Sequence, residues 1–281
     1  MDASAWLGQR TALVDRFLDA RLPPASEPPA ALHGAMRHLV FPGGKRLRPA
    51  FAFAGCEAAG GTAERALPAA AAVELVHTYS LIHDDLPCMD DDTLRRGRPT
   101  VHVAFGEANA VLAGDALLAL AFEALADAEA EAGAGAVAWC TRALAVAAGS
   151  RQLVGGQADD LAFAAGGPAT LARVESVHRR KSAALIAASV ACGARLAGAG
   201  TALLADLAAF GEEVGVAFQI ADDVLDADRN EACSSVSVMG LAAARERAEA
   251  LLAGALRRVD ELGERAAALR MLAELAVRRK A

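Results

Sequence analysis

Long apolar windows bounded by Gly or Pro make up most of this chain, and their lengths are those of helices. The windows run over residues 30–39, 49–59, 66–85, 104–130, 135–149, 171–193, 202–226 and 239–258. Alternation of apolar and polar residues with hairpin turns, which indicates strands, is not evident anywhere. The apolar residues are chiefly Ala and Leu, which favour helices, and aromatic residues make up only 4% of the chain. The sequence therefore predicts an all-α fold, a single bundle of about ten or more helices.

A Pro-rich stretch at residues 22–29 separates a short amphipathic N-terminal helix from the rest of the chain. Composition does not change after this linker, and no segment repeats at a fixed period. We therefore expect one domain over residues 1–281, of which residues 1–29 form the N-terminal helix and its linker.

Charge and cysteine content exclude several classes of function. The net charge is −7, which gives no basic surface for nucleic acid or anionic lipid. The five cysteines are scattered, without a CxxC pair, and we expect them to be reduced. The longest uncharged apolar stretches, such as Ser182 to Ala194, are shorter than the ~18 to 20 residues that cross a bilayer. The expectation is a cytoplasmic protein with no nucleic-acid partner and no stable membrane insertion.

Three aspartates, Asp222, Asp223 and Asp226, stand near the end of the apolar 202–226 window. Asp222 and Asp226 are four residues apart, so they share one face of a helix. Like charges ~6 Å apart repel by ~3 kcal/mol at an effective dielectric near 20. A cation offsets this repulsion, and clustered carboxylates that leave room for phosphate oxygens suit Mg²⁺.

A second acidic cluster, residues 84–92, ends the apolar window that Pro87 stops. Its members include Asp84, Asp85 and Asp90, near a helix C-terminus where the dipole disfavours carboxylates unless something positive binds. One such cluster alone is equally well explained by a solvated acidic loop. Two clusters, each at the end of an apolar helix, favour a site where two or three magnesium ions bind a diphosphate.

Basic residues gather beside these clusters although the chain is acidic overall. Lys45 and Arg48 follow a pair of glycines just before a helix start, an arrangement that suits an anion site. Arg95 and Arg96 directly follow the 84–92 cluster, and Lys181 is one of only three lysines in the chain. Each basic segment alone is better explained as a solvated turn. Together they indicate an anionic, metal-bridged substrate.

Taken in order, these motifs resemble those of the polyprenyl (isoprenyl) diphosphate synthases, and most closely the bacterial farnesyl diphosphate synthases, or geranyltranstransferases. The matching segments are residues 43–49, 74–92, 94–97, 155–157, 181 and 218–223, within a resemblance that runs from Phe41 to about Arg247. The resemblance implies the isoprenoid synthase fold, in which helices surround a central cavity and the two Asp motifs face each other at its mouth. It also implies a homodimer.

The resemblance assigns roles to individual residues. Asp84, Asp90 and Asp222 would bind Mg²⁺, about three ions with diphosphate bound and with Mn²⁺ as an alternative metal, while Asp85, Asp223 and Asp226 would be further ligands or partners of the ligands. The diphosphate of isopentenyl diphosphate would be held by Gly44, Lys45, Arg48, His77 and Arg96. The allylic diphosphate would contact Arg95, Lys181, Ser182 and Gln219.

The implied reaction joins isopentenyl diphosphate head-to-tail to dimethylallyl or geranyl diphosphate. The allylic C–O bond ionises because magnesium and basic side chains stabilise the departing pyrophosphate, and the double bond of isopentenyl diphosphate then attacks the cation. In the family, residues just before the first Asp motif close the chain pocket, which assigns this role to Tyr79, whereas helical geometry places Ser80 more directly beneath Asp84. We expect farnesyl diphosphate (C15), with geranylgeranyl diphosphate (C20) as the alternative.

One segment departs from the family. The interval 227–239 is shorter than the family's loop and contains no lysine, so an expected Lys contact to the allylic diphosphate has no match unless Arg229 replaces it. Loss of such a contact costs ~1.5 to 3 kcal/mol. This departure leaves open a weakly active or inactive modulating subunit of a prenyl synthase. A class I terpene cyclase shares the ionisation chemistry but needs no second diphosphate site, and a purely structural bundle leaves the acidic clusters unexplained.

Overall fold

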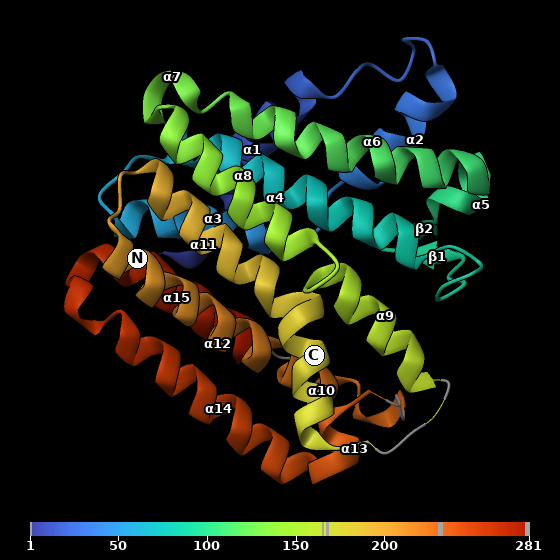
Figure 1. The fold of residues 1–281 in the computed structure, drawn as a ribbon. Helices are drawn as coiled ribbons and strands as arrows, with labels where there is room; N and C mark the ends of the chain where they lie inside the picture. The colour runs from blue at the N-terminus through green and yellow to red at the C-terminus, as the bar shows by residue number, and fades with distance from the viewer. Residues whose placement is uncertain (1, 165, 167–168, 230–232, 279–281) are drawn as a thin grey trace.

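The structure, a computed structural model, describes residues 2–164, 166, 169–229 and 233–278. Helices dominate it (Figure 1). In chain order they are α1 (Ala3–Arg21), α2 (Ala30–Val40), α3 (Leu47–Ala58), α4 (Ala63–Asp84), α5 (Val101–Phe105), α6 (Glu107–Ala126), α7 (Glu129–Ala132), α8 (Ala134–Ala148), α9 (Leu153–Ala164), α10 (Leu171–His178), α11 (Ala184–Leu196), α12 (Thr201–Leu225), α13 (Ser235–Met239), α14 (Leu241–Arg258) and α15 (Ala267–Val277). A π-helix, η1 (Arg179–Ala183), joins α10 to α11, and two 3₁₀ segments, η2 (Ala227–Arg229) and η3 (Asp260–Ala266), follow α12 and α14. A small antiparallel hairpin pairs β1 (Leu94–Arg95) with β2 (Arg98–Pro99).

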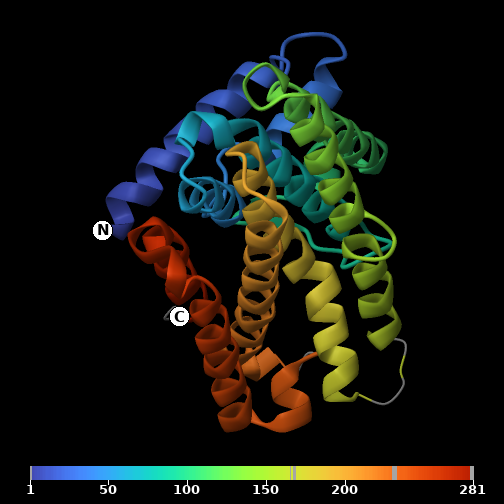
Figure 2. The same cartoon turned by 60° about the vertical axis from the view of Figure 1, so that its left-hand side comes forward.

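Helices α4 and α11 form the centre of the bundle. Helix α4 packs against α3, α6 and α11, and α11 packs also against α8 and α12. A Cβ atom added at Gly55 would overlap the Val190 carbonyl, and one at Gly193 would overlap the Ala52 carbonyl. Backbones of α3 and α11 therefore touch, which requires small residues on both helices. The turned view shows α1 and the C-terminal helices on one side and α9 on the opposite side (Figure 2).

The all-α prediction is confirmed, and each predicted window contains a helix. Four details differ. Gly106, with φ of 83°, divides the 104–130 window because it ends α5 and begins α6. Helix α9 was not predicted, since Gly155 and Gly156 near its start are residues typical of loops, and α15 lies beyond the last window. The β1–β2 hairpin was also missed, because its strands are too short to show alternation.

One described helical stretch, Glu107–Ala132, is long and apolar enough to cross a bilayer by length and composition. Its helix α6 packs along α4, and 44% of the apolar window is buried inside the protein. The core helix of a bundle meets the same criterion. All five cysteines are free thiols, in agreement with the sequence.

Candidate active site

Two adjoining cavities lie between the C-terminal end of α4, the hairpin, α9, η1 and α12. The larger has a volume of about 570 Å³ and the smaller about 310 Å³. They share three lining residues, Asp90, Lys181 and Gln219, all expected from the sequence to be in the site. Segments far apart in the chain therefore meet at one place.

The acidic cluster after α4 is shaped by a loop that turns back on the helix end. The Asp90 backbone N–H donates to the Asp84 carbonyl at 2.9 Å, so these two aspartates lie side by side although they are six positions apart in the chain. Burial raises the pKa of Asp84 to about 6; Lys181 opposes this shift and Asp90 adds to it. Asp85 is fully buried, and its Oδ1 accepts a 2.6 Å hydrogen bond from Arg95 Nε. Its Oδ2 is buried without a hydrogen-bond partner in the described structure.

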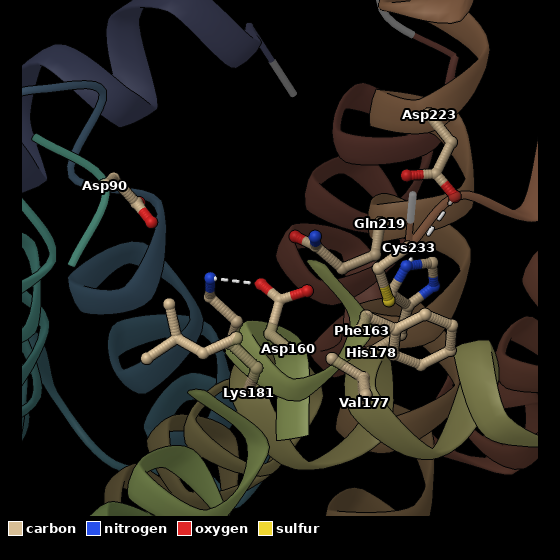
Figure 3. A pocket seen from close by; sticks show the side chains of 10 residues that line it. Asp90, Asp160, Phe163, Val177, His178, Lys181, Gln219, Asp223 and Cys233 are labelled. Carbon is tan, nitrogen blue, oxygen red and sulfur yellow. Dashed lines mark hydrogen bonds and ion pairs between the residues drawn. The ribbon is translucent and has the colours of Figure 1, made fainter. Parts of the chain in front are cut away.

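The second acidic cluster lies at the C-terminal end of α12. The Asp226 N–H donates to the Asp222 carbonyl at 2.9 Å, which places the two residues one turn apart. Asp223 is buried, and its Oδ2 accepts a 2.6 Å hydrogen bond from the Ser235 N–H and lies 3.6 Å from His178 Nε2. Figure 3 shows Asp90 and Asp223 on opposite sides of the smaller cavity. Carboxylates of both motifs thus border one space.

The donor set fits magnesium shared with a phosphate-bearing ligand. In the described part of the chain, no three His, Cys, Asp or Glu side chains lie close enough together to hold a metal ion by themselves. Mg²⁺ is usually bound by one or two carboxylates together with substrate phosphates and water, so a complete protein cage is not needed. A divalent cation would favour the ionised form of Asp84 and would give the unpaired Asp85 Oδ2 a partner.

Lys181, on the π-helix η1, lies between the two motifs. Its Nζ donates to Asp160 Oδ2 at 2.7 Å, and both residues point into the smaller cavity (Figure 3). Burial alone would lower the pKa of Lys181, but Asp160 and Asp84 raise it, so the ammonium stays charged. Asp160 was not predicted as a site residue. Its position three residues after Gln157, on the same side of α9, is the signal that could have found it.

A basic compartment of about 500 Å³ adjoins the larger cavity and shares Arg48, His77, Arg96 and Phe218 with it. Burial lowers the pKa of Arg48 to about 10, and burial together with Arg48 and Arg96 lowers the pKa of His77 well below its usual value, so His77 is neutral. Gly44 and the exposed Lys45 line the same compartment. A Cβ at Gly44 would lie 2.6 Å from the Arg96 guanidinium, so glycine leaves room for that side chain.

Arg46 is a residue whose role the sequence did not reveal. It is 3% exposed, donates to Glu74 Oε1 at 2.5 Å, to Asp15 at 2.8 Å and to the Val40 carbonyl at 2.7 Å. A Cβ at Gly43 would overlap its guanidinium. Arg46 therefore holds the glycine-containing loop in place, and the neighbouring Lys45 and Arg48 face the compartment.

Apolar and small polar residues also line the larger cavity. They are Ser80, Leu81, Leu153, Phe218 and the buried Ser182, which is 7% exposed. Tyr79 is 5% exposed and packs edge-on against His83, with ring centroids 5.8 Å apart, outside the described lining of the cavity. The structure thus places Ser80, rather than Tyr79, on the cavity wall.

The shortened segment after Asp226 is only partly described. Residues 230–232 and the side chain of Arg229, proposed from sequence as a replacement for the missing lysine, lie outside the described part. Beyond the gap, Cys233 lines the smaller cavity and Ser235 is fastened to Asp223. The chain therefore returns to the acidic motif soon after leaving it.

Comparisons with known proteins identify relatives of the whole fold. A family model described as polyprenyl synthetase matches residues 29–273. The chain is 39% identical to an FPP/GFPP synthase from Zymomonas mobilis, with a TM-score of 0.92 over 98% of this chain and 99% of that one. It is 31% identical to a geranyltransferase from Helicobacter pylori 26695, with a TM-score of 0.86 over 99% and 98% of the two chains.

Curated proteins from plants match this chain over part of their length. The chloroplastic geranylgeranyl pyrophosphate synthase of Catharanthus roseus is 45% identical over 202 residues, which make up 72% of this chain and 57% of that protein. The chain spans a similar share, 55%, of the corresponding protein from Capsicum annuum. It thus covers somewhat more than half the length of these curated relatives.

Proposed function

The chain belongs to the polyprenyl synthetase family and has the isoprenoid synthase fold, and from this premise we propose that it is a short-chain prenyltransferase dependent on magnesium. It condenses isopentenyl diphosphate head-to-tail with dimethylallyl or geranyl diphosphate. The observation that carries the proposal is the meeting of both acidic motifs and Lys181 around one space that opens onto an apolar wall. The adjoining basic compartment provides the second diphosphate site that a terpene cyclase does not need.

The acidic side chains divide into two groups. Asp84 and Asp90 on one side and Asp222 and Asp226 on the other would hold magnesium, which when bound neutralises the charge that develops on the leaving diphosphate. Asp85 accepts a hydrogen bond from Arg95, and Asp223 accepts one from Ser235. These two carboxylates are therefore proposed to fix the positions of the neighbouring metal ligands and to contribute to metal binding. The proposal accepts Mn²⁺ as an alternative ion.

The basic residues hold the two diphosphates apart from each other. Lys181 and Arg95, beside the carboxylates, hold the allylic diphosphate, with Ser182 and Gln219 close by. Lys45, Arg48 and Arg96 bind the diphosphate of isopentenyl diphosphate in the basic compartment. Because the two compartments adjoin and share Phe218, the double bond of one substrate would lie near the reacting carbon of the other.

The reaction follows from this arrangement. The C1–O bond of the allylic substrate breaks, and both its electrons leave with the diphosphate. The π electrons of isopentenyl diphosphate then form the new C–C bond to C1, and a proton lost from C2 of the isopentenyl unit restores a double bond. That proton goes to the released diphosphate, because the neutral His77, whose pKa burial and the neighbouring arginines hold low, is a poor base.

The proposed product is the C15 farnesyl diphosphate. Support comes from the similarity to the FPP/GFPP synthase of Zymomonas mobilis, whereas Tyr79, which packs against His83 outside the described lining of the cavity, adds none. The names of the relatives include farnesyl, geranylgeranyl and the longer geranylfarnesyl diphosphate, so product length needs a test of its own. A homodimer is also proposed, since α6 leaves Val111 and Leu112 exposed by 41% and 52%. The cytoplasmic location stays a prediction.

The test is product analysis with the purified chain, Mg²⁺, isopentenyl diphosphate and either allylic primer. We expect released pyrophosphate and mainly farnesyl diphosphate, and no turnover when the metal is chelated. A C20 product would overturn the assignment of chain length but not of activity. No product at saturating substrate, with a partner synthase recovered by affinity capture, would overturn the proposal in favour of a modulating subunit.

A further inference from the structure

Gln157 carries a buried side-chain amide that has no structural role in the described fold and no role in the proposed function. It is 6% exposed and lines the larger cavity. Neither its Oε1 nor its Nε2 has a hydrogen-bond partner among the described residues. An unpaired buried polar atom costs about 1 to 3 kcal/mol, so an amide left in this state is expected to interact with whatever fills the cavity.

The local backbone places Gln157 next to Lys181 and Ser182. A Cβ at the preceding residue, Gly156, would overlap the Lys181 backbone nitrogen, so only glycine allows α9 to contact η1 this closely. A π-helical turn such as η1 is itself frequent at functional sites. The Gly-Gly-Gln motif thus has a physical reason. Gly156 allows α9 to contact η1, and Gln157 lines the larger cavity.

Gln157 shares the larger cavity with charged side chains, Lys181, Asp84 and Asp90, and with the apolar Leu81 and Phe218. Because Gln157 follows Gly156, which lies against the Lys181 backbone, its amide is close to the residue proposed to hold the diphosphate. An allylic diphosphate bound with its head at Lys181 would therefore have its first carbons near Gln157. Those are the carbons that become positive when the C1–O bond breaks.

Resting on the proposed function, we propose that the side-chain oxygen of Gln157 faces the allylic carbons and stabilises the positive charge that develops there. The oxygen is the negative end of the amide dipole, and a dipole fixed in a water-poor cavity acts on developing charge without reorganisation. Gln157 is therefore an electrostatic stabiliser of the cation and contributes little to binding of the neutral hydrocarbon.

The first test is kinetic. Gln157→Leu should lower kcat by about 30-fold, which corresponds to about 2 kcal/mol on the barrier, and should leave KM for the allylic substrate within about threefold. Gln152→Leu is the matched control, because Gln152 precedes the same helix and also has a buried, unpaired Oε1 but lines a different cavity. It should leave both constants unchanged.

The second test measures binding without turnover. The probes are a thiolodiphosphate, whose carbons are neutral, and an allylic diphosphate analogue with a protonated amine in place of the cationic carbon. Gln157→Leu should bind the amine analogue at least about tenfold more weakly and the thiolodiphosphate about as well as the unchanged protein. Gln157→Glu, which places a full negative charge there, should bind the amine analogue more tightly than the unchanged protein.

Equal loss of affinity for both analogues would overturn the proposal, because it would show that Gln157 contacts the diphosphate or supports the fold. A change in KM for the allylic substrate, without a change in kcat, in Gln157→Leu would overturn the proposal as well. If the unchanged protein made no product and bound neither analogue, the proposed function itself would fail and this inference with it. A melting temperature for each variant shows whether it is folded. If Gln157→Leu does not fold, binding of the two analogues to Gln157→Glu decides the question.

Discussion

Asp84 is a carboxylate whose charged form the fold disfavours. Burial raises its pKa to about 6, above the value near 4 of an aspartate in an unfolded chain. The folded protein therefore binds this proton more tightly than the unfolded chain does. The contribution to the free energy of unfolding is fully present below about pH 4 and is lost as the pH rises through 6.

Replacing Asp84 by Asn should therefore stabilise the metal-free protein above pH 6, by at most about 3 kcal/mol, and should make no difference near pH 4. The same variant should lose prenyl transfer, because a metal ligand is gone. Melting temperatures of both proteins from pH 4 to 8 in the presence of a chelator check this. Asp115→Asn, at an exposed position of α6, is the control and should follow the unchanged protein. Curves that stay parallel for Asp84→Asn across the pH range would contradict the account.

Residues that carry charge in a motif could be located from sequence, whereas their partners could not. Asp84 and Asp90 could be identified because they belong to an acidic cluster, and Lys181 because lysines are rare in this chain. The structure brings all three together. Asp160 stands beside Asp159 in the chain, but nothing in the sequence tells which of the two enters the site, and Asp160 meets Lys181 because α9 packs on η1. For Tyr79 and Ser80, helical geometry correctly favoured Ser80 as the residue beneath Asp84, whereas the family resemblance favoured Tyr79, which does not line the described cavity.

At the scale of elements, the contact between α9 and η1 organises the site. We expect Gly156→Ala to lower the free energy of unfolding by about 1 to 3 kcal/mol, since its Cβ would overlap backbone rather than a movable side chain. Activity should fall as well, because Lys181 and Gln157 are displaced. Gly135→Ala in α8 is the control: nothing lies within 4 Å of its Cβ, so stability should stay the same or rise slightly. Urea unfolding of the two variants makes the comparison, and equal midpoints would show that the close approach is not required.

The same contact explains why some helices could be predicted from the sequence and others could not. Apolar windows between Gly and Pro predict helices well when Gly and Pro act as breakers, as for α4 and α12. In α9 and α3 the glycines stand inside helices because another backbone touches them there. Sequence alone cannot distinguish a glycine that ends a helix from one that lets two helices meet.

At the scale of the whole molecule, the fold brings two acidic clusters 130 residues apart in the chain to a common space. The all-α bundle follows from composition and periodicity, but the pairing of α4 with α11 and of α11 with α12, which brings the clusters together, depends on which small residues coincide. The segment after Asp226 is short, and its described end is fastened to Asp223 rather than extended over the site. The two clusters are therefore expected to bind one metal-bridged diphosphate together.

Joint binding is tested most directly by calorimetric titration of the purified chain with pyrophosphate, with and without Mg²⁺, alongside Asp90→Asn and Asp222→Asn. The account predicts that binding requires the metal and falls at least about tenfold in either variant, with little further loss in the double variant. Pyrophosphate that bound equally well without Mg²⁺, or that ignored Asp222→Asn, would contradict it.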